Sequence, residues 1–295
     1  MGRSRLRVET ADDDSGKTAS PMTSIAEAAN LGSSPVGGLP GKTLVIIPTY
    51  NEAESMPRQV AAVRAAQPEV DILIVDDNSP DGTGNIADNL AAADPQISVL
   101  HRAAKEGLGM AYVAGFEWGL ARGYEFLCEM DADGSHRAQD FGKLLARAAE
   151  PDRPDLVIGS RWVPGGAVES WPWHRKFLSE GGNFYVDTIL GIKVKDATAG
   201  YRVYRADLLK QIGLDNVESH GYCFQVDMTW RTVEAGGLVA EVPITFVERD
   251  YDESKMSGAI VREALWKTTL WGLSHRVAQI TGWLRRRKEP VSKPS

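Results

Sequence analysis

Short apolar runs alternate with helix-period segments through the first half of the chain. Strands are predicted at residues 43–48, 72–76, 97–101, 126–131 and 156–159. Helices are predicted between them, at residues 51–66, 84–93, 109–123 and 138–150. This alternation is typical of an α/β fold, a mostly parallel sheet with helices on both faces. Beyond residue 161 the pattern loosens, with an apolar, aromatic helix predicted within residues 171–192 and a late strand at 238–247.

Two of the predicted strands end abruptly in acids. Asp76 and Asp77 follow one strand, and Asp131 and Asp133 follow another. Ligands of open α/β sheets bind at the carboxyl ends of the strands. Carboxylates gathered there would repel one another unless a cation joined them, and their hard oxygens suit Mg²⁺ or Mn²⁺. The pattern therefore indicates a metal-dependent enzyme that acts on a nucleoside diphosphate.

Plainer explanations exist for these motifs. Asp76 and Asp77 could cap the following helix, but one acid is enough for a cap. Asp131 and Asp133 resemble the start of a calcium loop, yet Gly134 falls at the fourth position of that loop and the motif requires glycine at the sixth. The GTG at 82–84 is a weak dinucleotide signal, and the chain has no Walker A sequence.

Basic residues in turns and irregular segments form a second candidate set. The turn KEGLG at 105–109 brings Lys105 to the start of a helix, where a phosphate could approach the backbone. The other members of the set are Arg161, Arg175, Arg202, Arg249 and Lys255. Each could be an ordinary surface charge. Together, opposite an acid–metal set, they fit a site that holds more than one phosphate.

Composition limits the remaining choices. The chain has 295 residues and a net charge of −7, which argues against nucleic acid as a partner. Residues 1–40 are rich in Ser, Gly, Ala and Asp, so we expect a disordered tail without the order of a signal peptide. Cys128 and Cys223 stand alone in apolar stretches, so neither a disulfide nor a zinc site is expected.

The C-terminal segment hints at a membrane surface. No stretch approaches the roughly 18 apolar residues of a membrane span. Residues 258–288 instead carry a helix-period apolar stripe with tryptophans and end in the basic run 285–288, followed by a tail at 289–295. An amphipathic helix of this kind can lie among lipid headgroups. The alternative is a helix that packs on the domain.

Several motifs together resemble one family. They are PTYNE at 48–52, VDDNSPDGT at 75–83, GLG at 107–109, MDAD at 130–133 with SH at 135–136, GSR at 159–161 and DATAGYR at 196–202. This set is similar to that of the polyprenol (dolichol) phosphate mannose synthases, which are inverting family 2 glycosyltransferases of GT-A fold. The resemblance implies a catalytic domain at 41–257 with a membrane-facing helix at about 176–192.

The resemblance also implies substrates and residue roles. GDP-mannose would be the donor and a polyprenyl phosphate lipid the acceptor, with Mg²⁺ or Mn²⁺ as cofactor. The residues implied to hold the nucleotide are Pro48, Tyr50, Glu52, Asp76, Asp77, Lys105, Asp131 and Arg202. Those implied to hold the metal or to face phosphates are Asp131, Asp133, Arg161, Arg175, Ser179, Arg202, Arg249 and Lys255. Many relatives carry Gln where this chain has Ser135, which questions a metal contact at that position.

The expected chemistry needs no strong base, because a phosphate monoester is already ionised near neutral pH, with a second pKa of about 6. We expect a peripheral protein on the cytoplasmic face of the membrane, which a separate membrane protein could recruit. Three alternatives remain open. They are a polyprenyl-phosphate transferase that uses another nucleotide such as UDP-glucose, a processive polysaccharide synthase, and a phosphate-accepting signalling receiver. The second lacks its Gln-x-x-Arg-Trp motif here, and the third is much shorter than the span of these motifs.

Overall fold

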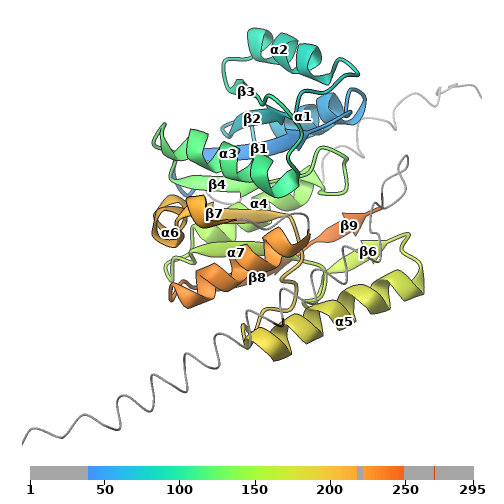
Figure 1. The fold of residues 1–295 in the computed structure, drawn as a ribbon, viewed down its shortest axis with the longest axis vertical. Helices are drawn as coiled ribbons and strands as arrows, with labels where there is room; N and C mark the ends of the chain where they lie inside the picture. The colour runs from blue at the N-terminus through green and yellow to red at the C-terminus, as the bar shows by residue number, and fades with distance from the viewer. Residues whose placement is uncertain (1–38, 218–221, 249–268, 270–295) are drawn as a thin grey trace, which may run out of the picture. The chain divides into compact units, whose positions relative to one another are not determined.

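A computed structural model describes residues 39–217, 222–248 and 269. Its main sheet has seven strands in the order β3-β2-β1-β4-β7-β5-β8 (Figure 1). The strands are β1 (Thr43–Thr49), β2 (Asp71–Asp76), β3 (Ile97–His101), β4 (Phe126–Glu129), β5 (Leu156–Ser160), β7 (Arg202–Arg205) and β8 (Val239–Pro243). All neighbours pair in parallel except β7, which is antiparallel to β4 and β5. The predicted mostly parallel sheet is confirmed.

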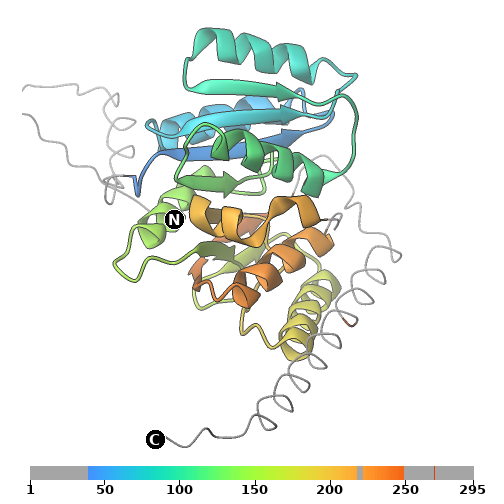
Figure 2. The ribbon, with the colours of Figure 1, turned by 60° about the vertical axis from the view of Figure 1, so that its left-hand side comes forward.

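The apolar residues of the strands alternate between two cores, one on each face of the sheet. Leu44 and Ile46 join a core that holds residues of α3, α6 and α7, whereas Val45 and Ile47 join a core with residues of α1, α2 and α4 (Figures 1 and 2). The bounds are α1 (Ser55–Ala66), α2 (Thr83–Ala93), α3 (Leu108–Leu120), α4 (Ala138–Ala148), α6 (Ala206–Ile212) and α7 (Tyr222–Glu234). A short 3-10 helix, η1 (Leu214–Asn216), comes between α6 and α7 in the chain. Burial on both faces explains why the strands have no polar side.

The strand order reverses beside β1. The chain proceeds from β1 to β2 and β3 on one side and then returns to place β4 on the other. Such a switch point opens a crevice at the carboxyl ends of the strands, where ligands of this class of fold bind. The acids after β2 and β4 flank this point, as the sequence predicted.

A smaller sheet and a long helix follow β5. Strands β6 (Ala167–Glu169) and β9 (Thr245–Val247) pair in parallel, and α5 (Trp173–Leu190) lies beside them (Figure 1). The helix has few anchors, because its buried residues are only Asn183, Val186 and Leu190. Tyr185 of α5 hydrogen-bonds Thr269, with 2.6 Å between the two hydroxyl oxygens.

The structure corrects several predicted elements. The strand predicted at 238–247 is two strands in different sheets, because pairing with β5 stops at Pro243 and Thr245 donates its N–H to Asp140 Oδ2 (3.0 Å). The helix predicted at 51–66 begins only at Ser55, after an irregular loop. Sequence reasoning missed β6, β7, α6 and α7.

Other predictions lie outside the described residues. These are the tail before Leu39, the helix predicted at 258–288 apart from Thr269, and the tail at 289–295. Among the described residues, no helix is both long enough and apolar enough to cross a bilayer.

Candidate active site

The segments that follow β1, β2 and β3 carry four polar residues that make two contacts, Lys105 with Tyr50 and Arg102 with Asp77. Lys105 lies over the ring of Tyr50, with its Nζ 3.8 Å from the ring centroid. Arg102, which sequence reasoning missed, follows β3 and places Nη1 2.6 Å from Asp77 Oδ1. Two of these side chains are cationic and one is an aromatic ring. The corner can therefore face a base on one side and phosphate on the other.

Asp77 is nearly buried, with 5% of its surface exposed. Burial raises the pKa of its carboxyl above the usual value, and the Arg102 guanidinium partly offsets that rise. The Arg102–Asp77 pair thus keeps a polar group at the base of the crevice, available to accept from a ligand hydroxyl.

Asp76 is bound within its own loop, and its predicted nucleotide role stays a prediction. Its carboxylate accepts from Ser79 Oγ (2.6 Å) and Ser79 N (3.3 Å), and only 3% of the residue is exposed. Gly84 packs against the Asp76 carboxylate, and a larger residue would clash there, because a Cβ at position 84 would come within 2.8 Å of Asp76 Oδ2. Asp76 therefore shapes the loop after β2. The N-cap of α2 is Gly82, and Asp81 just before it accepts from Thr83 N at Oδ1 (3.0 Å).

Pro48 and Glu52 lie at the end of β1 and in the loop after it, and their observed contacts are structural. Pro48 is buried within β1 opposite Val75. Glu52 donates its N–H to Thr83 Oγ1 (3.0 Å), and its carboxylate accepts from the Ser55 hydroxyl. These contacts hold the loop after β1 against the loop after β2. A direct contact of either residue with nucleotide stays a prediction.

Asp131 and Asp133 follow β4 as predicted, and each carboxylate is held by donors of the protein. Tyr112 donates its hydroxyl to Asp131 Oδ1 (3.0 Å). Ser135 donates both its backbone N–H (2.8 Å) and its hydroxyl (2.5 Å) to Asp133 Oδ1. Ser135 is 1% exposed. It orients Asp133, and the doubtful metal contact of Ser135 itself stays untested.

A second polar layer lies beneath the acids. Glu129 of β4 is fully buried, and burial raises its pKa to about 7, opposed by the charge of Arg202 and a hydrogen bond from Gln225. Gln225 Nε2 lies 2.6 Å from Glu129 Oε2. The carboxylate–amide contact links β4 to α7. No sequence signal had marked either residue.

Arg202, predicted to meet nucleotide or phosphate, belongs to this layer. None of its surface is exposed. Its guanidinium donates to Ala197 O (2.7 Å), Ala199 O (2.6 Å) and Thr229 Oγ1 (3.0 Å). A buried arginine with these partners fixes the segment that leads into β7. A direct contact of Arg202 with nucleotide or phosphate stays a prediction.

The donor set after β4 fits a hard divalent cation. Among the residues the structure describes, no group of three or more His, Cys, Asp or Glu side chains forms a closed metal cage. Two carboxylates are nevertheless what Mg²⁺ commonly takes from protein beside a nucleotide, since phosphates and waters complete its shell. The Asp131 side chain is 23% exposed, so it remains reachable from the crevice.

Arg161 follows β5 but is already paired. Its backbone N, Nε and Nη2 lie 2.9, 2.8 and 2.6 Å from the carboxylate of Asp196, which is fully buried. Asn183 of α5 reaches the same carboxylate, with 3.3 Å between Nδ2 and Oδ1. The cluster ties α5 to β5. This structural role is observed, and the role of Arg161 as a phosphate ligand stays a prediction.

Arg175 is better placed than Arg161 to meet a ligand. It lies in the first turn of α5, with its guanidinium carbon 4.2 Å from the ring centroid of Trp171, and it forms an ion pair with Glu248. Its side chain is 22% exposed. Ser179 lies one turn further along α5 and is partly exposed. Arg249 and Lys255 lie outside the described residues.

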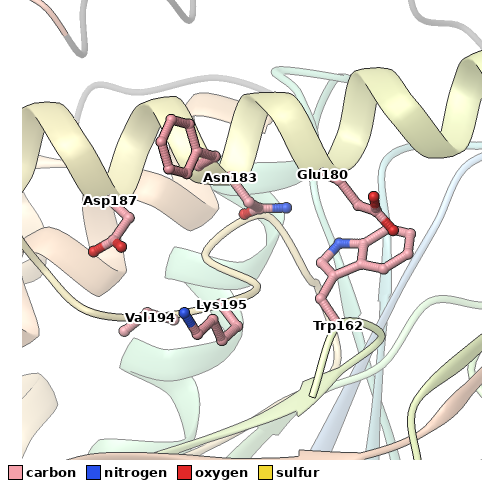
Figure 3. Close-up of a pocket in the computed structure, with 7 residues that line it drawn as sticks. Trp162, Glu180, Asn183, Asp187, Val194 and Lys195 are labelled. Carbon is pink, nitrogen blue, oxygen red and sulfur yellow. The ribbon is translucent and has the colours of Figure 1, made fainter. Parts of the chain in front are cut away.

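A pocket of about 230 Å³ lies beneath α5 (Figure 3). Trp162 and Asn183 line it on the side of the Arg161 cluster, and Phe184, Val194 and Lys195 line it further along. Glu180 and Asp187 add two acids from the helix. The pocket shows that α5 is not packed tightly along its length.

Comparison with known proteins decides the family. The model described as glycosyl transferase family 2 matches residues 44–213. The chain belongs to this family. It is therefore a glycosyltransferase, and the suspected relationship to the polyprenol phosphate mannose synthases is confirmed at the level of sequence.

Two relatives are similar over most of their length. A polyprenol monophosphomannose synthase of Mycolicibacterium smegmatis is 54% identical over 83% of this chain and 92% of its own. An undecaprenyl-phosphate mannosyltransferase of Micrococcus luteus is 57% identical over 80% of this chain and 96% of its own.

Solved structures share the fold at low identity. A glucosyl-3-phosphoglycerate synthase of Mycobacterium tuberculosis has a TM-score of 0.58 at 16% identity, with 79% of this chain and 80% of that one covered. A mannosyltransferase of Pyrobaculum calidifontis, in complex with GDP-Man and Mn²⁺, has a TM-score of 0.50 at 14% identity, with 89% and 79% covered. The predicted GT-A fold is confirmed.

Proposed function

We propose that this glycosyltransferase moves mannose from GDP-mannose to a polyprenyl phosphate, giving polyprenyl β-mannosyl phosphate, and that the transfer depends on Mg²⁺ or Mn²⁺. The observation that carries the proposal is a crevice edge that has carboxylates suited to a metal and nucleotide as well as a cation suited to a second phosphate. Asp77 and the Asp131/Asp133 pair follow β2 and β4, the two neighbours of β1. Arg175 stacks on Trp171, and the rings of Trp171, Phe246 and His136 form a chain of contacts from there to the turn after Asp133. The names of the two similar relatives support mannose and a polyprenyl phosphate.

The donor side would bind the nucleotide and neutralise its leaving group. Tyr50 and Asp77 offer an aromatic face and a carboxylate to the base and ribose, and Lys105 offers charge to the diphosphate. Asp131 and Asp133 would hold the cation. When bound, it would supply positive charge against the developing negative charge on the departing diphosphate.

The acceptor side would gather and orient a second anion. Arg175 has its guanidinium presented by Trp171 and paired with Glu248, a carboxylate that a phosphate dianion could displace. Because the acceptor oxygen is already ionised, the protein has to align it in line with the anomeric carbon and need not deprotonate it. Arg161 would hold α5 in place indirectly, because Asp196 binds both Arg161 and Asn183 of α5.

The outer face of α5 fits the lipid part of the acceptor. Trp173, Phe177 and Phe184 are 80%, 73% and 74% exposed, and Leu178 lies beside them at 50%. A single apolar side chain in water is ordinary, but a row of aromatics on one helix marks a contact surface. We propose that this face meets the membrane and that the protein is peripheral on the inner face. The predicted membrane helix at 258–288 and a separate anchoring protein stay predictions.

The direct test uses purified full-length chain with Mn²⁺, labelled GDP-mannose and a polyprenyl phosphate. We expect label in the lipid fraction, loss of transfer in EDTA, and recovery with Mn²⁺ or Mg²⁺. A parallel reaction with UDP-glucose tests the alternative donor. Transfer from UDP-glucose in place of GDP-mannose would replace the donor in the proposal, and no transfer from either would contradict it.

A further inference from the structure

Asp131 is held by two aromatic side chains that no part of the proposed mechanism uses. Tyr112 approaches it from α3, and His136 approaches it from the turn that follows. We propose that Tyr112 and His136 are positioning residues that fix the carboxylate of Asp131 before a divalent cation binds. The inference rests on the proposed metal role of Asp131 and deepens it.

Tyr112 is a rigidly placed donor. It is fully buried, and its ring stacks with that of Phe224 at 6.1 Å and an interplanar angle of 9°. Its helix lies unusually close to the sheet, because a Cβ on Gly115 would come within 2.6 Å of Ile46 Cγ2.

His136 lies next to both the backbone N–H and the carboxylate of Asp131. The backbone N–H of Asp131 donates to His136 Nδ1 (3.0 Å), which requires that nitrogen to be unprotonated. In the neutral ring the proton is then on Nε2, which lies 3.9 Å from Asp131 Oδ2. The imidazole is 2% exposed and stacks on Tyr201 at 4.8 Å and 18°. Its orientation is therefore set by packing.

The two contacts leave Asp131 little freedom to turn. Tyr112 occupies a lone pair of Oδ1, and His136 fixes the backbone and faces Oδ2. Asp133 is restrained in a parallel way, by Ser135. A carboxylate that is already oriented loses less entropy when it binds a cation. Partners of this kind typically contribute about 10-fold to 100-fold to metal affinity.

Tyr112→Phe tests the proposal because it removes only the hydroxyl and keeps the stacked ring. Tyr124→Phe is a matched control. Tyr124 is also a buried tyrosine that donates to an aspartate, with 2.8 Å between its hydroxyl and Asp71 Oδ2. Asp71, however, is the first residue of β2, at the other end of the strand from Asp76 and Asp77. Each full-length protein is titrated with Mn²⁺ in the presence of GDP, and free Mn²⁺ is followed by electron paramagnetic resonance.

We expect Tyr112→Phe to weaken Mn²⁺ binding about 10-fold or more, with Tyr124→Phe unchanged. In the transfer reaction, Tyr112→Phe should raise the KM for Mn²⁺ while kcat recovers at saturating metal. Equal Mn²⁺ affinity in wild type and Tyr112→Phe would overturn the inference. A lowered kcat that excess Mn²⁺ does not restore would also overturn it, since that indicates a direct role in transfer.

His136 gives a second, independent pair of variants. His136→Asn keeps an acceptor for the Asp131 N–H, whereas His136→Phe keeps the ring stack and removes the acceptor. We expect weaker Mn²⁺ binding in His136→Phe than in His136→Asn, and the opposite order would contradict the role assigned to Nδ1. Failure of the proposed function has a different signature: wild type itself would then bind no Mn²⁺ with GDP.

Discussion

The proposed donor side and the proposed acceptor side of the crevice are built in different ways. On the donor side, Asp77, Asp131 and Asp133 sit at the ends of parallel strands and each is held by a donor of the protein. On the acceptor side, Arg175 lies on a helix with only three buried residues and is held by an indole ring and a carboxylate. The donor side is thus fixed by the sheet. The acceptor side depends on a few polar contacts and leaves an apolar face exposed to meet a lipid.

The largest expected effect is on the donor side. Asp133→Ala should reduce transfer by about 10³-fold or more, because it removes a ligand of the cation that neutralises the leaving group. Transfer of labelled mannose to lipid measures the loss, and thermal unfolding checks that the fold remains. Asp207→Ala is the control, since the Asp207 side chain is 83% exposed on α6. Substantial turnover by Asp133→Ala would remove Asp133 from the metal site.

The next effect concerns the cluster that joins the two sides. Asp196→Ala should lower the free energy of unfolding by about 3–5 kcal/mol, because Arg161 would be left as an uncompensated buried charge. Urea denaturation measures this. Asp152→Ala should change the midpoint little, because its ion pair with Arg147 lies at the surface. An equal, small effect for both variants would show that the buried cluster does not hold α5 to β5.

A smaller effect is expected for the acceptor cation. Arg175→Ala should raise the KM for polyprenyl phosphate about 10-fold to 100-fold, the cost of one charge-assisted contact. Glu248→Gln should lower the same KM, because the acceptor phosphate would no longer compete with a carboxylate for the guanidinium. Steady-state rates at varied acceptor concentration give both values. A KM unchanged in Arg175→Ala would place the acceptor phosphate elsewhere.

The smallest effect concerns the outer face of α5. Phe177→Ser should weaken sedimentation with anionic vesicles about 10-fold, because burial of such a side chain is worth at least about 1.5 kcal/mol. Transfer to a short, water-soluble acceptor should change less, since it requires no bilayer. Leu238→Ser is the control, an exposed apolar residue just before β8. Unchanged vesicle binding would show that α5 does not face the lipid.

The donor side was also the easier one to predict. Its strands are continuous apolar runs, and the acids at their ends are unambiguous in the sequence. Asp131, Asp133 and Asp77 were therefore found together with the sheet that places them. The partners Tyr112 and Arg102 were missed, because a tyrosine in an apolar helix looks like core and an arginine after a strand looks like surface.

The acceptor side was predicted less well for a physical reason. Arg161 and Arg202 lie in similar glycine-flanked turns of the sequence. Only the fold brings Asp196 to Arg161 and the backbone carbonyls of Ala197 and Ala199 to Arg202. β7 was missed because it is short and starts and ends with arginine. The late strand was predicted as one because Pro243, where the pairing with β5 ends, was not treated as a break.

The division of the crevice into two sides is tested most directly by calorimetry of GDP with Mn²⁺ in the absence of lipid. Asp77→Asn should weaken GDP binding about 10-fold or more, because Asp77 would lose its charge within the nucleotide corner. Arg175→Ala should leave GDP binding unchanged, since Arg175 would meet only the acceptor. Weakened GDP binding in Arg175→Ala together with unchanged binding in Asp77→Asn would contradict the division.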